Sequence, residues 1–170
     1  MTARTLVAGI GNIFLSDDGF GSEVARRMLG LDVPDGVRIE DFGIRGVHLA
    51  YEILNGYDTV VLVDAVDTSE PPGTVSVIEP DLSGEPGSVG GLPVALDAHG
   101  MDPVAVLAMV RDLGGQLDRV LLVGCQPAVL EEGIGLSAPV AGALDAAVQV
   151  VLDLIVNAST PGACLKEEPA

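Results

Sequence analysis

The segment Thr59–Val63 constrains the fold of this chain more than any other. Four of its five residues are Val or Leu, with no alternation between apolar and polar side chains. A strand of this kind is buried on both faces, as happens in parallel sheets that helices cover on each side. The chain is therefore predicted to be an α/β protein built around a parallel sheet.

Other apolar segments alternate with helical patterns in the order that such a sheet requires. Further strands are predicted at Thr5–Ile10, Val37–Phe42, Gly73–Ile78 and Val120–Gly124. Helices are predicted at Phe20–Leu29, Gly46–Leu54, Pro103–Leu113 and Ser137–Val156. Because two prolines precede it, the Gly73–Ile78 strand is expected at an edge, in antiparallel orientation. This alternation favours a single-domain, doubly wound, mostly parallel twisted sheet of about five strands with helices on both faces.

The expected domain covers residues 1–156, and the polar segment 157–170 is expected to be a disordered tail. We see no signal peptide and no apolar run that approaches the ~20 residues of a membrane span, so a cytoplasmic protein is expected. The two cysteines, Cys125 and Cys164, do not form a disulfide framework.

Basic residues are scarce in this chain. Its 170 residues include 8 Lys and Arg against 25 Asp and Glu, for a formal net charge of −17. No Lys or Arg occurs between residues 46 and 110. Nucleic acids and anionic membranes both bind clustered Lys and Arg, so this balance argues against either partner. The acidic stretch is interpreted either as a region that attracts cations or as compositional drift.

Candidate functional residues follow the predicted strands, where ligands bind in doubly wound sheets. Asp17 and Asp18 precede the first helix, Asp64 directly follows the Thr59–Val63 strand, and His99 precedes a later helix. Each has a structural interpretation, such as a helix cap, a turn cap or a structural loop histidine. Because strands one and three are neighbours in the common doubly wound orders, Asp18, Asp64 and His99 are predicted to meet. Two carboxylates and an imidazole suit nickel, cobalt or zinc.

The loop Gly9–Asn12 is glycine-rich but is not typical of a nucleotide site. A dinucleotide fingerprint needs a small residue at position 14, where Phe14 is expected to block close packing of helix on strand. Asp17 and Asp18 would repel a pyrophosphate at the helix start. A Gly-Lys-Ser/Thr motif does not occur. A nucleotide-binding module is therefore disfavoured, and it is kept as an alternative function that calorimetry with a dinucleotide would test.

Five motifs, in this order and spacing, resemble the hydrogenase maturation endopeptidases, and the resemblance covers about Leu6 to Val156. The motifs are Gly9–Gly21 with Ser-Asp-Asp-Gly, Asp41–Gly46, Val-Leu-Val-Asp64-Ala, His99, and Val123–Leu136 with Val-Gly-Cys-Gln-Pro. The resemblance implies a metal-dependent endopeptidase. Its substrate would be the large-subunit precursor of a [NiFe] hydrogenase, from which it removes a C-terminal extension after nickel insertion.

The resemblance also implies the residues of the site. The metal ligands of the family fall on Asp18, Asp64 and His99, and Asp41 falls on a further catalytic position. Nickel is expected to arrive with the substrate, and zinc or cadmium is expected to substitute in vitro. The metal would polarise the scissile carbonyl or activate water, or else only dock the substrate while Asp41 or Asp17 acts as base. The alternative function is a non-hydrolytic nickel-binding chaperone for hydrogenase assembly.

Overall fold

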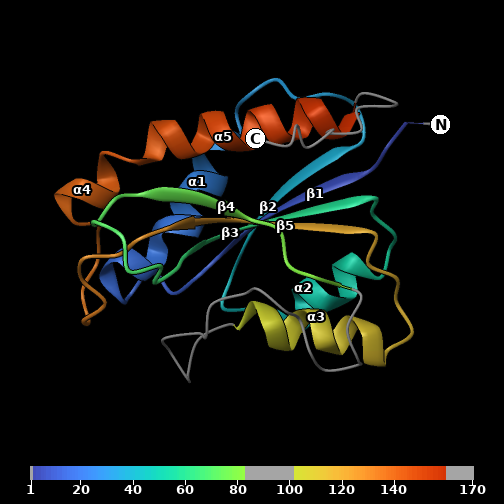
Figure 1. Ribbon diagram of the computed structural model, residues 1–170, viewed down its shortest axis with the longest axis horizontal. Helices are drawn as coiled ribbons and strands as arrows, with labels where there is room; N and C mark the ends of the chain where they lie inside the picture. The colour runs from blue at the N-terminus through green and yellow to red at the C-terminus, as the bar shows by residue number, and fades with distance from the viewer. Residues whose placement is uncertain (1, 83–101, 160–170) are drawn as a thin grey trace, which may run out of the picture.

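A five-stranded sheet in the order β2-β1-β3-β5-β4 forms the centre of the protein (Figure 1). The structure is a computed structural model, which describes residues 2–82 and 102–159. β1, β2, β3 and β5 are parallel, and β4 pairs with β5 in antiparallel orientation at one edge. The elements in chain order are β1 (Thr5–Ile10), η1 (Ser16–Gly19), α1 (Phe20–Met28), β2 (Val37–Gly43), α2 (Gly46–Ile53), β3 (Thr59–Ala65), β4 (Val75–Ile78), α3 (Pro103–Asp112), β5 (Arg119–Cys125), α4 (Ala138–Ala141) and α5 (Leu144–Ser159).

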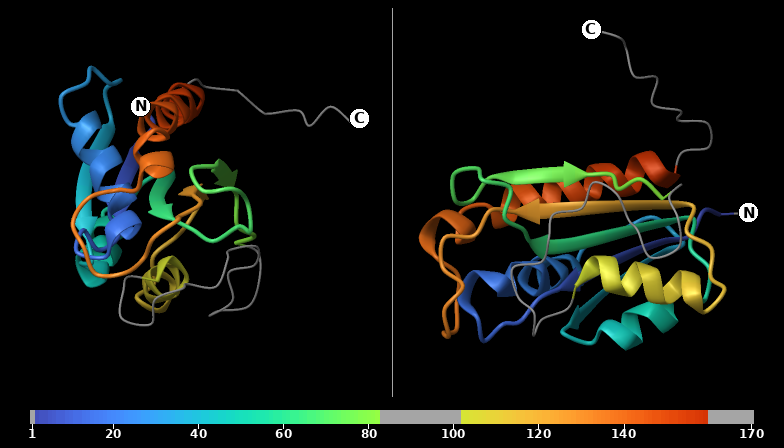
Figure 2. Two further views of the ribbon diagram at one scale, coloured as in Figure 1. Left: turned by 90° about the vertical axis from the view of Figure 1, so that its left-hand side faces the viewer. Right: turned by 60° about the horizontal axis from the view of Figure 1, so that its bottom comes forward.

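Helices cover both faces of the sheet, as Figure 2 shows from two sides. α1 and α5 lie on one face and α2 and α3 on the other, each pair enclosing its own apolar cluster. Along β3, Val61 and Val63 belong to the α1/α5 cluster, whereas Val60 and Leu62 belong to the α2/α3 cluster. Six of the seven residues of β3 are buried. The predicted fold class, including a central strand buried on both faces and an antiparallel edge strand, is confirmed.

The C-terminal helix differs from its prediction. The single helix expected over residues 137–156 is divided into α4 and α5 around Gly142. The N–H of Ala143 bonds to the carbonyl of Val140, only three residues back, which tightens the chain at this point. Glycine is a poor helix former, so the break occurs where local helix stability is lowest. α5 also continues to Ser159, so the tail predicted from residue 157 is wrong for 157–159, and residues 160–170 lie outside the described part.

The stretch Ala138–Ala158 is long and apolar enough to cross a membrane. The expectation that no run approaches this length is therefore wrong. Its inner face is nevertheless part of the core, where Leu144, Ala147, Val151 and Ile155 are buried against the sheet. Because these residues repeat at helical spacing, packing on the sheet accounts for part of the apolar character of α5.

Candidate active site at the carboxyl ends of the strands

Asp18 and Asp64 lie close together at the carboxyl ends of β1 and β3, which are neighbouring parallel strands. Gly11 separates them: a Cβ at this position would lie 1.9 Å from the carbonyl oxygen of Asp18 and 3.4 Å from Oδ1 of Asp64. Gly11 also has a φ of +132°, which a residue with a side chain rarely adopts. The Asp18 carboxylate accepts a hydrogen bond from the N–H of Asn12 at 2.8 Å. Only a glycine at position 11 lets the two aspartates approach this closely.

Asp64 is a buried carboxyl group, with 8% of its surface exposed. Burial raises its pKa well above the usual range, and the charges of Asp18 and Asp102 raise the pKa further. The N–H of Ala65 donates to Oδ1 at 2.8 Å, which opposes this shift. Within residues 2–82 and 102–159, no Lys or Arg forms an ion pair with Asp64. A carboxyl group in such surroundings favours either a proton or a bound cation.

Asp64→Asn is expected to raise the stability of the metal-free protein at pH 7. Because its folded-state pKa is raised, the folded protein holds a proton that the unfolded chain releases, and wild-type stability falls as pH rises above about 4. The amide cannot ionise, so the gain should be present at pH 7 and absent below about pH 4. Urea unfolding with a chelator at both pH values measures it. An Asp64→Asn protein no more stable than wild type at pH 7 would contradict the expectation.

Asp17 is fully buried and joins the loop after β1 to the loop after β5. Its Oδ2 accepts hydrogen bonds from the N–H groups of Ala128 and Val129 and from the hydroxyl of Ser137, each at 2.8 Å. Its Oδ1 accepts one from the N–H of Ser137 at 2.7 Å. Burial acts to raise the pKa of Asp17, but these hydrogen bonds outweigh it, and the pKa is lowered. A base must reach water or substrate, so Asp17 instead positions its neighbour Asp18.

Asp17→Asn is expected to destabilise the protein by about 3 kcal/mol, because an amide nitrogen then faces a buried N–H donor. Because the folded-state pKa of Asp17 is lowered, its contribution to wild-type stability is present above the unfolded pKa of about 4 and is lost as pH falls through the folded-state value. The variant should therefore differ from wild type less at acid pH than at pH 7. Urea unfolding across this range measures the difference, with the exposed Asp35→Asn as control. Equal stability at pH 7 would contradict the positioning role.

Asp41 is held on the opposite face of the sheet from Asp64. Its Oδ1 accepts the hydroxyl of Ser22 at 2.7 Å, and its Oδ2 lies 3.3 Å from Nε of Arg26. Both partners belong to α1. Side chains alternate between the two faces along β3, and Asp64 lies on the face that α2 and α3 cover, as Val60 and Leu62 do. The structure therefore does not bring Asp41 together with Asp64. Its catalytic role stays a prediction that follows from the resemblance.

His99, the third predicted metal ligand, lies outside the described residues. Within the described ranges, no three His, Cys, Asp or Glu side chains are grouped closely enough to hold a metal ion. The described part of the site thus supplies two carboxylates, Asp18 and Asp64. Carboxylate oxygens can bind a divalent cation, so the pair fits part of the predicted ligand set.

Backbone contact between α1 and the sheet sets the position of η1 and its aspartates. A Cβ on Gly21 would lie 2.0 Å from the carbonyl oxygen of Val63 and 2.3 Å from that of Ile10, and a Cβ on Gly9 would lie 2.3 Å from the carbonyl oxygen of Gly21. Phe14, which was expected to block such packing, is 61% exposed and takes no part in it. A dinucleotide fingerprint would place this close approach at position 14, but in this protein Gly9 and Gly21 make it.

Cys125, at the end of β5, is a free and buried cysteine. Burial and the nearby charge of Asp17 raise the pKa of its thiol to about 11. A thiol that stays protonated at neutral pH is a poor nucleophile. The structure therefore gives Cys125 a packing role.

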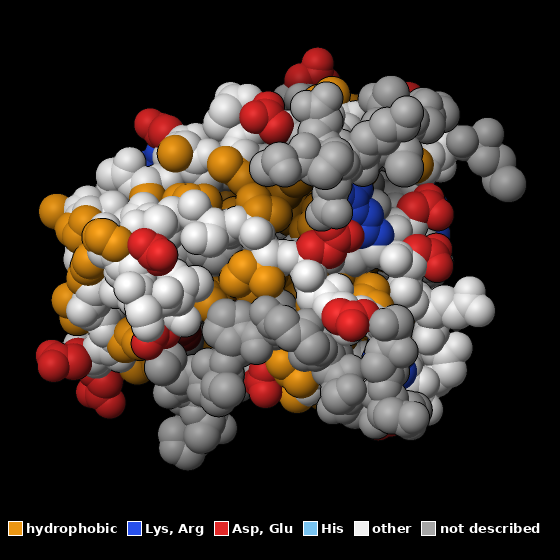
Figure 3. Space-filling model, viewed as in Figure 1, with side chains coloured by type: hydrophobic (Ala, Val, Ile, Leu, Met, Phe, Trp, Pro, Cys, Tyr) orange, Lys and Arg blue, Asp and Glu red, His pale blue; other side chains and the backbone are white. Residues whose placement is uncertain are grey.

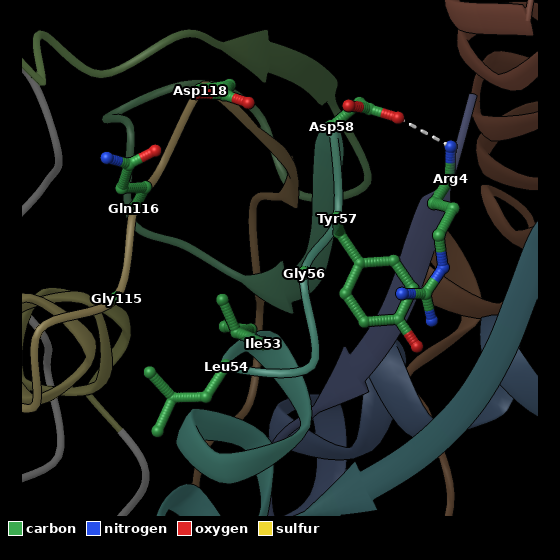
Figure 4. Close-up of a pocket in the computed structure, with 9 residues that line it drawn as sticks. All are labelled: Arg4, Ile53, Leu54, Gly56, Tyr57, Asp58, Gly115, Gln116 and Asp118. Carbon is green, nitrogen blue, oxygen red and sulfur yellow. Dashed lines mark hydrogen bonds between the residues drawn. The ribbon is translucent and has the colours of Figure 1, made fainter. Parts of the chain in front are cut away.

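A pocket of about 320 Å³ lies at the amino ends of the strands, beside the start of β1 and β3 and opposite the end that carries the aspartates (Figure 4). The guanidinium of Arg4 lies 4.7 Å from the ring centroid of Tyr57. The backbone N–H of Arg4 donates to Asp58 at 2.7 Å, and its Nη1 donates to the carbonyl of Asn55 at 2.9 Å. Arg4 thus holds together the segments at the amino ends of β1 and β3. The pocket is separate from the site formed by Asp18 and Asp64.

Comparison with known proteins agrees with the fold and the motifs. A family model described as hydrogenase maturation protease (HycI) matches residues 23–154. The hydrogenase expression/formation protein HupD of Rhizobium leguminosarum bv. viciae is 34% identical over 154 residues, which are 89% of this chain and 74% of that protein. HoxM of Azotobacter vinelandii, also a hydrogenase expression/formation protein, is 33% identical over 160 residues, covering 92% of this chain and 75% of HoxM.

A solved structure extends the comparison to three dimensions. The hydrogenase maturating endopeptidase HybD from E. coli superimposes with a TM-score of 0.75 at 29% identity, covering 90% of this chain and 92% of HybD. The family match includes Asp41, Asp64 and the position of His99, whereas Asp18 lies just before it. Because the family model covers well over half of the sequence, the chain belongs to the hydrogenase maturation protease family.

Proposed function

We propose that this protein removes the C-terminal extension of a [NiFe] hydrogenase large-subunit precursor after nickel insertion, and that it recognises the nickel held by the substrate. The observation that carries the proposal is the pair of carboxylates at the strand ends, Asp18 and Asp64. They approach one another across Gly11, and one of them is buried without an ion-pair partner among the described residues. Membership of the maturation protease family supplies the reaction class, which is peptide hydrolysis.

The residues of this chain have distinct parts in the proposed reaction. Asp64 accepts the N–H of Ala65 at Oδ1, and its Oδ2 makes no hydrogen bond with any described residue. Asp18 is held by Asn12, so both carboxylates are oriented before substrate arrives. Since their negative charges repel, a divalent cation between the two carboxylates would stabilise both of them. His99 is the proposed third ligand. The nickel that arrives with the precursor would then lie beside the peptide bond to be cut and polarise its carbonyl.

This arrangement explains why cleavage would follow nickel insertion. A precursor without the metal offers nothing to offset the desolvation and mutual repulsion of Asp18 and Asp64. A nickel-loaded precursor neutralises them and is bound in preference. Protons compete for the same carboxylates, so binding of the loaded precursor should weaken as pH falls.

The test is incubation of the purified protein with nickel-loaded and nickel-free precursor, followed by mass spectrometry of the released peptide. We expect one C-terminal peptide, released only from the loaded precursor. Cleavage of the nickel-free precursor at an equal rate would show that nickel is not the recognition element. Binding of the loaded precursor without any release of peptide would instead support the nickel-binding chaperone. Zinc or cadmium in place of nickel would show whether the pair discriminates among these ions.

A further inference from the structure

Exposed apolar side chains lie on the loops after β1 and β5, beside the candidate active site. The exposed fractions are 61% for Phe14, 40% for Val129 and 84% for Ile134. Large apolar residues exposed singly are ordinary on protein surfaces, but a group beside a functional site is typical of a binding surface. We refer to Phe14, Val129 and Ile134 as the apolar rim.

Backbone pairing between the two loops holds the apolar rim together. Leu15 and Gly133 form a parallel bridge, and the N–H of Gly133 donates to the carbonyl of Phe14 at 2.9 Å. Phe14 and Ile134 each lie one residue from the bridge, which therefore keeps them near one another.

The apolar rim is continuous with the candidate active site. Phe14 precedes Asp18 by four residues in one loop. The carbonyl of Val129 accepts the N–H of Asp17 at 3.0 Å, and the N–H of Val129 donates to the carboxylate of Asp17. A polypeptide bound on the rim therefore has its adjoining residues beside the aspartates.

The charge around the apolar rim is almost entirely negative. Four loops follow the parallel strands, and their only basic residue is Arg45. Their acidic residues are Asp17, Asp18, Asp67, Glu70, Glu131 and Glu132. Figure 3 shows acidic and apolar side chains at its left end, where α4 lies, and the largest basic area to the right of centre. An occupant of this edge must supply positive charge to be attracted to it.

We propose that the apolar rim docks a segment of the hydrogenase precursor that carries apolar side chains flanked by Lys or Arg, outside the peptide bond that is cut. This inference rests on the proposed function. The apolar contacts would supply affinity, and the acidic surroundings would make binding dependent on salt. The rim is a docking surface, so its loss should raise KM and leave kcat nearly unchanged.

The experiment measures the Kd of nickel-loaded large-subunit precursor by biolayer interferometry at low and high salt, and kcat and KM for peptide release. The variants are Phe14→Ser/Ile134→Ser and Glu131→Gln/Glu132→Gln. The matched control is Leu29→Ser/Leu113→Ser, whose side chains are 60% and 50% exposed at the ends of α1 and α3. Because every substituted side chain is exposed, thermal unfolding of all variants should match wild type.

The apolar variant is expected to weaken binding and raise KM about tenfold or more, while the control stays within about twofold. The Glu variant should bind with a smaller salt dependence than wild type. Apolar-rim variants that bind as tightly as wild type, or a control that weakens binding equally, would overturn the inference. If the apolar variant cleaves the precursor with an unchanged KM, the docking role of the apolar rim is wrong and the proposed function stands. If binding depends on the apolar rim but no peptide is released, the proposed hydrolysis is wrong and the docking role stands.

Discussion

Asp64→Asn is expected to abolish release of the C-terminal peptide, lowering the rate by roughly a thousand-fold or more. The amide keeps the shape of the carboxyl group but cannot supply a negative oxygen to a cation. The same variant is expected to be more stable than wild type at neutral pH, because the amide neither has to take up a proton on folding nor places a charge beside Asp18. Loss of activity together with a gain of stability separates a functional role from a structural one, since a damaged fold would lower both.

The assay for Asp64 is the mass-spectrometric release of peptide from nickel-loaded precursor. Asp35→Asn is the matched control, because Asp35 is an exposed carboxylate in the loop that precedes β2. Asp18→Asn is expected to behave like Asp64→Asn. If Asp64→Asn cleaves at the wild-type rate, the assignment of Asp64 to the metal-recognition site is wrong.

Gly21→Ala is expected to destabilise the protein by more than about 3 kcal/mol or to prevent folding. In an exposed helix the same change stabilises by up to about 1 kcal/mol, because alanine is the better helix former. Here the added methyl group would meet the carbonyl oxygens of Val63 and Ile10 at 2.0 and 2.3 Å. Both are backbone atoms of central strands, so α1 itself must move, and with it the aspartates of η1.

Gly30→Ala is the control for Gly21→Ala, because no atom lies within 4 Å of a Cβ at Gly30. Thermal and urea unfolding of both variants measure the effect. We expect Gly30→Ala to stay within about 1 kcal/mol of wild type. A Gly21→Ala protein as stable as Gly30→Ala would show that α1 can shift without cost, and that the close contact does not set the position of Asp18.

Much of the fold was predictable because buried strands have a local signature. The Val-rich segment before Asp64 needs burial on both faces wherever it occurs, and the crossover helices follow from parallel pairing. The helix expected over 137–156 failed at one point, around Gly142. There the N–H of Ala143 bonds three residues back and interrupts the helix. The spacing of apolar residues gives no sign of such an interruption.

The candidate site was predictable in part for the same reason. Asp64 is predictable because it directly follows a buried strand. Asp18 is predictable because it lies between the neighbouring strand and the helix that follows it. The resemblance to the family assigned the metal to Asp18, but the residues themselves did not show that Asp17 is a buried structural anchor. Asp17 is bound by Ala128, Val129 and Ser137, which are more than a hundred residues away in sequence, so two adjacent carboxylates look alike until the loops meet.

By itself, the sequence determined the layers of this protein, the family it belongs to and the strand ends where its aspartates lie, since these depend on local apolar patterns and motif order. Tertiary structure alone decided which aspartate is buried as a structural anchor, which face Asp41 occupies, and which glycines let α1 reach the sheet. Each of these depends on contacts between backbone segments distant in the chain. Such contacts arise only when the sheet and its helices pack together.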